Sequence, residues 1–237
     1  MALPKVGYPT YELDLPSTGK KIKYRPFVVK EEKVLLLALE GENEDEIKIA
    51  VKDLIKNCVL SRIKVDELPS FDLEYIFLKI RAASVGEVVN MTITCRDDGK
   101  TQVEHNIDLN QLQVTKPEGH SSKIMLNDTT GMIMKYPSMD RFVENEFLNK
   151  AIKTDDVFQF IADSIDQIFD DESVYDSSTT TKKEKLEFVE SLTAKQFESI
   201  QKFYETMPKL QYSFTVKNPN TGVESEYIIE GMQNFFA

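Results

Sequence analysis

The stretch Thr10-Tyr-Glu-Leu-Asp-Leu-Pro-Ser-Thr-Gly-Lys-Lys-Ile-Lys-Tyr-Arg25 decides how the chain begins to fold. Polar and apolar residues alternate before Pro16 and again after Gly19, as they do in strands that bury one face. The segment between them, Pro16-Ser-Thr-Gly19, has turn residues, so we predict a β-hairpin. Pro26 ends the second strand, because proline lacks the N–H that a further ladder bond needs.

Three stretches with helical character follow the hairpin, at residues 31–39, 44–60 and 71–85. The first is apolar around most of its girth, which is typical of a helix that is buried or covers a partner. In the second, apolar residues recur at spacings of three and four, and Cys58 lies on that stripe as a buried small hydrophobe. Ser70 is the expected N-cap of the third.

The alternating pattern returns after Gly86, and helices and hairpins share the rest of the chain. Thr181 with Glu184, and Thr193 with Gln196, fit capping boxes at the start of two of these helices. A polar stretch at residues 176–183 is expected to be a mobile loop. We predict strands at 88–95, 102–107, 123–126, 132–135, 210–216 and 224–229, and helices at 139–151, 155–169, 182–190 and 194–206.

These elements predict an α+β protein with an N-terminal β-hairpin, several amphipathic helices and further β-hairpins. We expect two parts: residues 1–115, with a hairpin, helices and a hairpin, and residues 116–237, with helices and a C-terminal hairpin. Helix 71–85 leads into hairpin 88–107 as helix 194–206 leads into hairpin 210–229, so a repeated helix–hairpin unit stays open beside chance recurrence.

The composition excludes several classes of function. The 237-residue chain has a formal net charge of −11, and an acidic surface repels the polyanions DNA and RNA. No run approaches the roughly 18 apolar residues of a membrane-spanning helix, and the start lacks the apolar run of a signal peptide. Two cysteines cannot build a disulfide framework, so a reducing cytoplasm is expected.

Charge is distributed unevenly along the chain. Residues 1–30 hold six basic and two acidic residues, whereas residues 155–176 hold eight acidic residues and no basic one. Opposed charges of this kind suit association by complementarity, either between copies or with other proteins. The alternative is that both are solvated faces, and the acidic run at 163–172, which lacks the ligand spacing of an EF-hand, is expected to be a solvated helix face.

The sequence offers little for catalysis or metal binding. Its two histidines are His105 and His120, and although Cys95 and His105 could meet across a hairpin, no third group orients them. Two hairpin turns have the shape of zinc knuckles, but Cys95-Arg-Asp-Asp98 has one thiolate and Lys217-Asn-Pro-Asn220 has none. We expect no enzymatic activity, no cofactor and no structural zinc.

Several blocks in combination carry a family resemblance. They resemble the baseplate hub proteins of T4-like contractile-tailed phages, most densely over residues 9–95 and weakly over 110–190. The blocks are Pro9-Thr-Tyr-Glu-Leu-Asp-Leu-Pro-Ser17, Tyr24-Arg-Pro-Phe27, Val29-Lys-Glu-Glu-Lys-Val-Leu-Leu-Leu37, Asn57-Cys58, Leu68-Pro-Ser-Phe-Asp-Leu-Glu-Tyr-Ile-Phe77, Arg81-Ala-Ala-Ser-Val85 and Glu230-Gly-Met-Gln-Asn-Phe-Phe236.

The resemblance implies a non-enzymatic structural or assembly protein of the tail baseplate hub that acts by protein–protein binding. Its implied partners are other hub proteins, with a homo-oligomer left open, and its implied location is the host bacterial cytoplasm during assembly and then the virion tail. The resemblance also implies cysteine pairs at the hairpin turns, and this chain departs from it by having Cys95 alone. A hub-associated cell-wall hydrolase and an unrelated soluble α+β binding domain are the alternatives.

We predict that the partner-binding surface combines the first hairpin, helix 31–39 and the C-terminus. The second strand alternates basic with apolar side chains, and helix 31–39 has more apolar girth than a two-layer domain buries. The two terminal phenylalanines either pack into the chain's own core or are offered to another protein. The predicted binding residues are Lys21, Lys23, Tyr24, Arg25, Phe27, Phe235 and Phe236.

Overall fold

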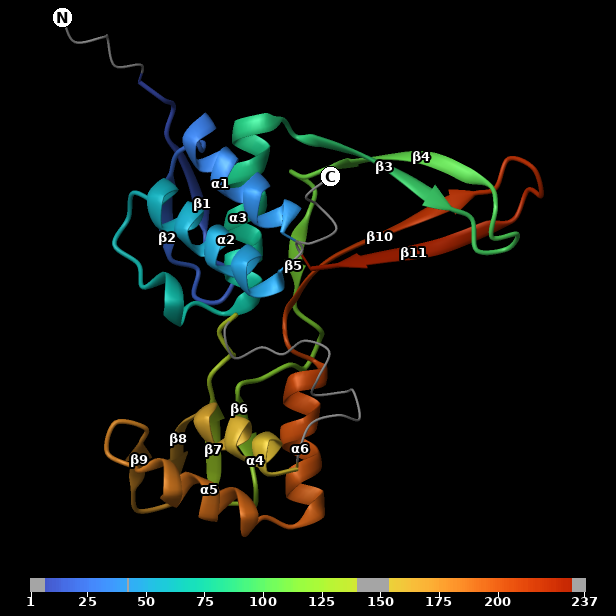
Figure 1. The fold of residues 1–237 in the computed structure, drawn as a ribbon. Coiled ribbons are helices and arrows are strands. Elements are labelled where there is room, and N and C mark those ends of the chain that lie inside the picture. The colour runs from blue at the N-terminus through green and yellow to red at the C-terminus, as the bar shows by residue number, and fades with distance from the viewer. Residues whose placement is uncertain (1–6, 42, 140–153, 232–237) are drawn as a thin grey trace, which may run out of the picture. The chain divides into compact units, whose positions relative to one another are not determined.

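A computed structural model describes residues 7–41, 43–139 and 154–231 (Figure 1). Six α-helices and eleven strands lie within these ranges, which confirms the predicted α+β class. The chain divides into two compact units. Unit 1 consists of Met1–Thr115 and Lys209–Ala237, and unit 2 consists of Lys116–Pro208.

The predicted N-terminal hairpin forms in unit 1 from β1 (Tyr11–Asp14) and β2 (Lys21–Tyr24). Leu13 pairs with Ile22, and both are buried, so the alternation of the sequence does place one face inside. The turn is held from outside the hairpin: the Ser17 backbone N–H donates to an oxygen of the Asp72 carboxylate at 3.0 Å, and the Ser17 hydroxyl donates to the other oxygen. Asp72 therefore attaches the hairpin to a helix.

Three helices and a short 3₁₀ turn follow the hairpin: α1 (Val29–Glu40), α2 (Glu44–Cys58), η1 (Val65–Glu67) and α3 (Ser70–Val85). The predicted stripe of α2 is buried from Ala50 onward, with Cys58 fully inside. Helix α3 is buried around most of its circumference, which makes it the central helix of unit 1. The predicted cap is wrong by one residue: Pro69 is the N-cap, and Ser70 is already helical and buried.

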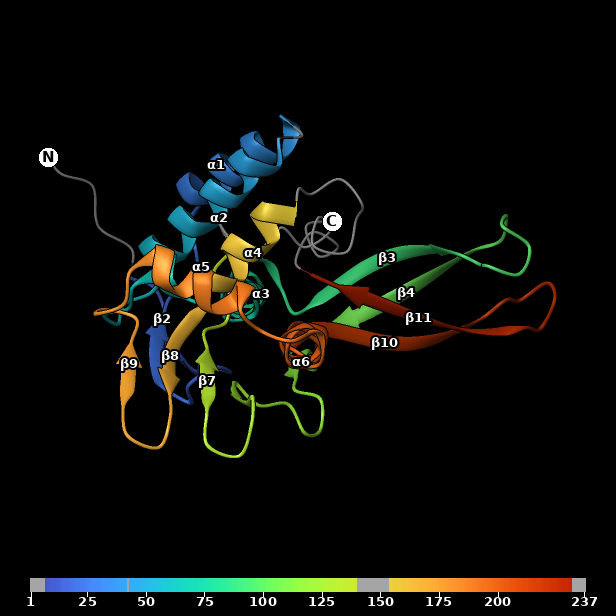
Figure 2. The ribbon, with the colours of Figure 1, turned by 90° about the horizontal axis from the view of Figure 1, so that it is seen from below.

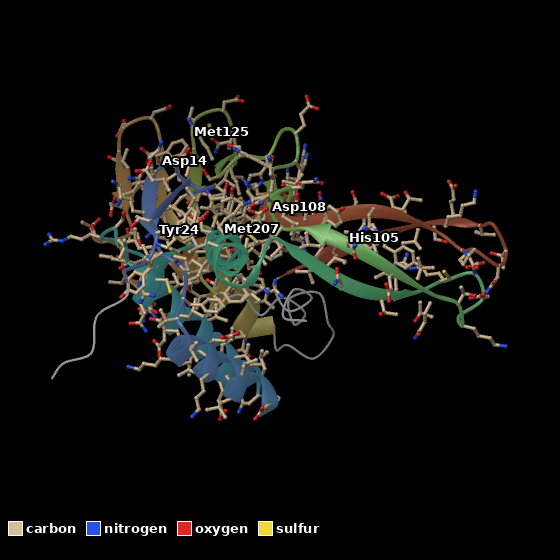
Figure 3. The ribbon with its side chains drawn as sticks, turned by 90° about the horizontal axis from the view of Figure 1, so that it is seen from above. Asp14, Tyr24, His105, Asp108, Met125 and Met207 are labelled. Atoms are coloured by element: carbon tan, nitrogen blue, oxygen red, sulfur yellow. The ribbon has the colours of Figure 1, made fainter. Side chains whose placement is uncertain are left out.

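Two long hairpins complete unit 1. One is β3 (Val88–Thr94) with β4 (Gln102–Asp108), and the other is β10 (Lys209–Lys217) with β11 (Glu224–Glu230). They run together away from the helices as an arm (Figures 1 and 2). His105 lies on the arm in Figure 3, and its ring stacks on Phe214 of the other hairpin, with ring centroids 4.0 Å apart.

The predicted C-terminal part of residues 116–237 is divided in the structure. The short strand β5 (Gln113–Thr115) pairs with Lys209–Gln211 of β10, so the final hairpin shares a sheet with the first part of the chain. Pairing across about a hundred residues of sequence leaves no local signal. The same division separates the proposed repeats, because α6 (Ala194–Glu205) belongs to unit 2 while β10 and β11 belong to unit 1.

Unit 2 is a four-stranded sheet with helices packed on it. The sheet order is β6-β7-β8-β9, from β6 (Lys123–Met125), β7 (Gly131–Met134), β8 (Ile165–Phe169) and β9 (Val174–Asp176). The helices are α4 (Thr154–Asp163), α5 (Lys182–Glu190) and α6. Both predicted capping boxes are present, at Thr181 with Glu184 and at Thr193 with Gln196.

One predicted element of unit 2 is partly wrong. The helix expected at 155–169 ends at Asp163, and residues 165–169 form β8 between β7 and β9. The Ser164 hydroxyl donates back to the Phe160 carbonyl at 2.9 Å at this junction. Ile165 and Ile168 suit a buried strand as well as a helix stripe, because a short apolar run fits both periods.

Because that helix ends at Asp163, the acidic run at 163–172 does not form the expected solvated helix face. Asp166 lies on β8 and pairs with Lys135 at 2.8 Å, and Asp170 accepts backbone hydrogen bonds from Glu172 and Ser173 in a turn. These carboxylates are therefore not on one helix face. Part of the stretch expected to be a loop, at 176–183, belongs to β9 and to the start of α5. The helix predicted at 139–151 lies almost wholly outside the described residues.

Candidate protein-binding surface

Helix α1 presents an apolar face to solvent. Its inner side buries Leu35 and Ala38 in unit 1. The opposite side carries four exposed apolar residues and two exposed lysines, Lys30 and Lys33. The exposed fractions are 79% for Val29, 50% for Val34, 52% for Leu36 and 56% for Leu37. We call Val29, Lys30, Lys33, Val34, Leu36 and Leu37 the α1 face. Contiguous exposed apolar residues rimmed by charge are typical of protein–protein contact sites.

A largely buried ion pair holds α1 in place. The Arg25 guanidinium donates to both oxygens of the Glu31 carboxylate, at 2.6 and 3.0 Å, and also to the backbone carbonyl of Asn57 at 3.0 Å. Glu31 in turn accepts the Val28 backbone N–H at 2.8 Å, just before α1 begins. The Arg25 side chain, directly after β2, thus joins α1 through its bidentate contact with Glu31 and the end of α2 through Asn57, so the α1 face is presented from a fixed base.

Electrostatics within this cluster follow from the pairing. The hydrogen bond from Arg25 is the main cause that lowers the pKa of Glu31, and the same bond raises the pKa of Arg25. Cys58 lies beside them, with its Sγ 3.8 Å from a Glu31 carboxylate oxygen. Burial, helped by the Glu31 charge, raises the pKa of the Cys58 thiol to about 12, so the thiol is protonated at neutral pH.

The predicted binding residues of the first hairpin have different surroundings. Lys21 and Lys23 are exposed, and their ammonium groups lie 3.8 and 3.4 Å from the Glu12 carboxylate. Tyr24, labelled in Figure 3, is buried and stacks on Tyr11 with ring centroids 5.6 Å apart. Arg25 is held by Glu31, and Phe27 is half-buried. Phe235 and Phe236 lie outside the described residues.

The two hairpin turns that resemble zinc knuckles in shape meet at the tip of the arm. The Asn218 side-chain amide donates to carboxylate oxygens of Asp97 and Asp98, each at 3.0 Å, and Asn218 itself is buried. Thr221 donates its hydroxyl to Asp97, and Asn220 donates its amide to the Thr101 hydroxyl. We call this set the tip lock. It joins the two hairpins by hydrogen bonds between side chains.

The Asp98 carboxylate is the most strongly bonded group of the tip lock. It accepts from the Thr101 hydroxyl and from the backbone N–H groups of Lys100 and Thr101. These bonds, with the Thr101 hydroxyl first, hold the pKa of Asp98 far below its usual range. Over the described ranges, no cluster of three or more histidine, cysteine, aspartate or glutamate side chains is placed to hold a metal ion.

The two histidines and Cys95 form no common site. In the β3–β4 hairpin His105 pairs with Met91, whereas Cys95 hydrogen-bonds to Thr101 nearer the turn, so the two side chains that could have met across the hairpin are at different levels of it. His120 belongs to unit 2, where Thr206 accepts its Nδ1–H and the Tyr136 hydroxyl donates to its Nε2, both at 2.9 Å. This tautomer follows from Thr206, which already donates to the Lys202 carbonyl.

The sequence did not reveal the residues that hold the candidate surface and the arm in place, chiefly Glu31 and Asn218. Glu31 reads as an ordinary helix acid, and only its position three residues after Val28 could have indicated a cap. Asn218 lies in an Asn-Pro-Asn turn, which predicts the turn but not a bond to a hairpin 120 residues away. Among the helices the structure describes, none is long and apolar enough to span a membrane.

Comparison with known proteins gives one match. A family model described as T4 bacteriophage base plate protein matches residues 8–237, nearly the whole chain. Comparisons with curated proteins and with solved structures found no match. The matched range includes all of unit 2 and nearly all of unit 1, with the α1 face and the tip lock. The chain therefore belongs to the T4 bacteriophage base plate protein family.

Proposed function

We propose that this chain is a non-enzymatic structural or assembly protein of the tail baseplate hub, and that it acts by binding other hub proteins. Family membership supports a phage baseplate structural protein. The α1 face is the observation that carries the finer proposal, because four exposed apolar side chains on one helix leave a surface whose burial would be favourable. The proposed site of action is the host cytoplasm during assembly and the virion tail.

Charge supports a partner with an acidic rim. Lys30 and Lys33 lie on the α1 face, and Lys21 and Lys23 are exposed on the adjoining hairpin. Acidic groups around an apolar patch on the partner would meet these lysines and set the orientation of binding. We include Phe235 and Phe236 in the proposed surface from the sequence alone.

The hydrolase alternative rests on a carboxylic acid with a raised pKa. Burial is the main cause that raises the pKa of the Asp72 carboxylic acid. Both of its oxygens accept hydrogen bonds from Ser17, so the side chain is used to hold the first hairpin. We therefore propose a structural role for Asp72. Clearing of peptidoglycan by the purified protein, lost on Asp72→Asn at unchanged fold, would favour the hydrolase.

Hub assembly with and without an altered α1 face tests the proposal. Leu36→Ser with Leu37→Ser should reduce incorporation into hub complexes by about tenfold or more, because both side chains leave the contact. The matched control is Ile49→Ser on α2, whose side chain is 60% exposed and is not one of the α1-face residues. Equal incorporation of all three proteins at unchanged melting temperature would overturn the role of the α1 face.

A second experiment addresses the terminal phenylalanines. Phe235→Ser with Phe236→Ser should lower incorporation without changing the melting temperature, if both rings belong to the surface. A large fall in melting temperature would instead place the rings in the chain's own core. The two phenylalanines would then not be part of the proposed binding surface.

A further inference from the structure

Strand β3 has an open edge. It belongs to a two-stranded sheet with β4, and no other described strand pairs with it. Figure 2 shows β3 along one margin of the arm. The side chains of Val88, Asn90 and Thr92 are exposed. An unpaired strand edge displays a row of backbone donors and acceptors to solvent.

The register shows which backbone groups face outward. Cys95 donates its N–H to the Thr101 carbonyl at one end of the hairpin, and Leu109 donates to the Glu87 carbonyl at the other, both at 2.7 Å. Bonded and non-bonded pairs alternate in an antiparallel ladder. Odd-numbered residues of β3 therefore bond to β4, and the N–H and C=O groups of Val88, Asn90 and Thr92 point away from it.

The open stretch ends toward the tip. The Thr94 carbonyl, next in this outward series, accepts a hydrogen bond from the Tyr227 hydroxyl at 3.1 Å. Tyr227 also accepts the Arg96 backbone N–H at 2.9 Å. The outward groups of Val88, Asn90 and Thr92 therefore form a short edge with Asn90 at its centre.

This edge lacks the usual protection against pairing. Open edges are normally guarded by charged side chains or proline. Strand β3 has neither from Val88 to Thr94. The other outward edges of the arm differ, because β4 carries Glu104 and Asp108, and β11 carries Glu224, Glu226 and Glu230. The outer edge of β10 is already taken at its start by β5.

We propose that the β3 edge binds the β3 edge of a second copy of this chain, antiparallel and centred on Asn90. Around a two-fold axis Asn90 lies opposite Asn90 of the partner copy, and Val88 lies opposite Thr92. No charge meets its own kind in this arrangement, whereas the β11 edge would set glutamates beside one another. The two hairpins then form one continuous sheet. This proposal does not depend on a role in the baseplate hub.

The dimer should be weak. One short strand pair buries less surface than a stable interface requires, so we expect a dissociation constant on the order of 10 μM. Sedimentation velocity over a concentration series measures it directly. A wild-type protein that remains monomeric at about 100 μM would overturn the proposal, because such a Kd predicts mostly dimer there.

Asn90 has a matched control on the other strand. Asn106 pairs with Asn90 in the hairpin, is also exposed, and directs its N–H to the outer edge of β4. Each asparagine can be changed to proline on an edge where no described strand uses the N–H. Asn90→Pro should weaken dimerisation by at least about tenfold, since both copies lose a central donor. Asn106→Pro should leave it within about twofold.

Two further pairs of variants keep the backbone donors. Asn90→Lys places two lysines opposite each other and should weaken the dimer, while Asn106→Lys should not. Asn90→Cys should give an intermolecular disulfide on mild oxidation, because opposed residues of a bonded pair have Cα atoms about 5.5 Å apart. Asn106→Cys should stay monomeric on a denaturing gel. If the Asn90 and Asn106 variants behave alike in these measurements, pairing through β3 is overturned. The lysine and cysteine variants decide this even if the proline variants unfold.

Discussion

The Arg25 guanidinium lies 2.6 Å from the Glu31 carboxylate, and each of the two side chains is only 12% exposed. Arg25 was predicted to bind a partner, but its bidentate contact lies inside unit 1, where it fixes the start of α1. The residue can therefore influence binding through the position of the α1 face. Lys21 and Lys23, which are exposed, are the cations of this strand that a partner can reach directly.

Arg25→Met should lower the free energy of unfolding by about 3 kcal/mol, because Glu31 is left as a largely buried charge without its partner. Urea unfolding at pH 7 measures the loss. The control is Lys21→Met, which removes an exposed ion pair and should cost under about 1 kcal/mol. Adding Glu31→Gln to Arg25→Met should recover part of the stability. Similar losses for Arg25→Met and Lys21→Met would contradict a structural role for the Arg25–Glu31 pair.

Both cysteines should be unreactive in the folded protein. Cys58 and Cys95 are free and buried, and burial raises the pKa of each thiol, to about 12 for Cys58. A thiol reagent needs both access and the thiolate, so we expect slow labelling in native buffer and two labelled thiols per chain in urea. Rapid labelling of native protein, located by peptide mapping to Cys58, would show that the α1–α2 contact opens readily.

Local elements could be predicted because their signals are local. The first hairpin, helices α1 to α3, both capping boxes and the long hairpins follow from alternation, helical spacing and turn residues within a few positions. The exposed apolar side of α1 was also predictable, since the helix has more apolar residues than its buried side can hold, and Val34, Leu36 and Leu37 are left exposed. Burial of Tyr24 was equally predictable, because residues two apart in a strand share a face and Ile22 is on the buried face of β2.

The remaining features depend on long-range contacts. Residues 165–169 could pack as a helix or a strand, and pairing with both β7 and β9 selects the strand. Likewise, β5 is too short to recognise until β10 pairs with it. Asp97, Asp98 and Asn218 looked like turn residues or lost metal ligands, and their bond to one another requires the two hairpins to be aligned.

Stability should fall in mild acid through His120. Burial lowers the pKa of His120 below its ordinary value of 6.5, and Lys116 adds to this effect. The unfolded chain therefore takes up the proton first, so this contribution is complete above pH 6.5 and decreases as the pH falls toward the folded-state pKa. Melting temperatures measured from pH 8 to pH 5 should show a smaller decrease for His120→Gln than for wild type over the upper part of that range. Identical slopes would contradict this assignment.

Folding should not depend on zinc. Asp98 and Asn220 occupy the turns where a knuckle would need thiolates: Asn220 donates its amide to the Thr101 hydroxyl, and Asp98 already accepts several hydrogen bonds. Chelator treatment should leave the melting temperature unchanged, and native mass spectrometry should show no metal added to the mass of the protein. A tightly held zinc ion per chain, with a sharp drop in melting temperature on chelation, would show that the tip of the arm is a metal site after all.

The tip lock should respond to a change of charge at Asn218. Asn218→Asp replaces the shared amide by a third carboxylate beside Asp97 and Asp98, so at pH 7 the two turns should repel each other. We expect amide exchange at residues 95–101 and 218–223 to become about tenfold faster or more, because local opening is then easier. Asn220→Asp, which loses one exposed bond to Thr101, is the matched control and should change exchange little. If Asn218→Asp leaves exchange at both turns as slow as in the wild type, the hairpins are held by their stacked strands, including His105 on Phe214, and not by the tip lock.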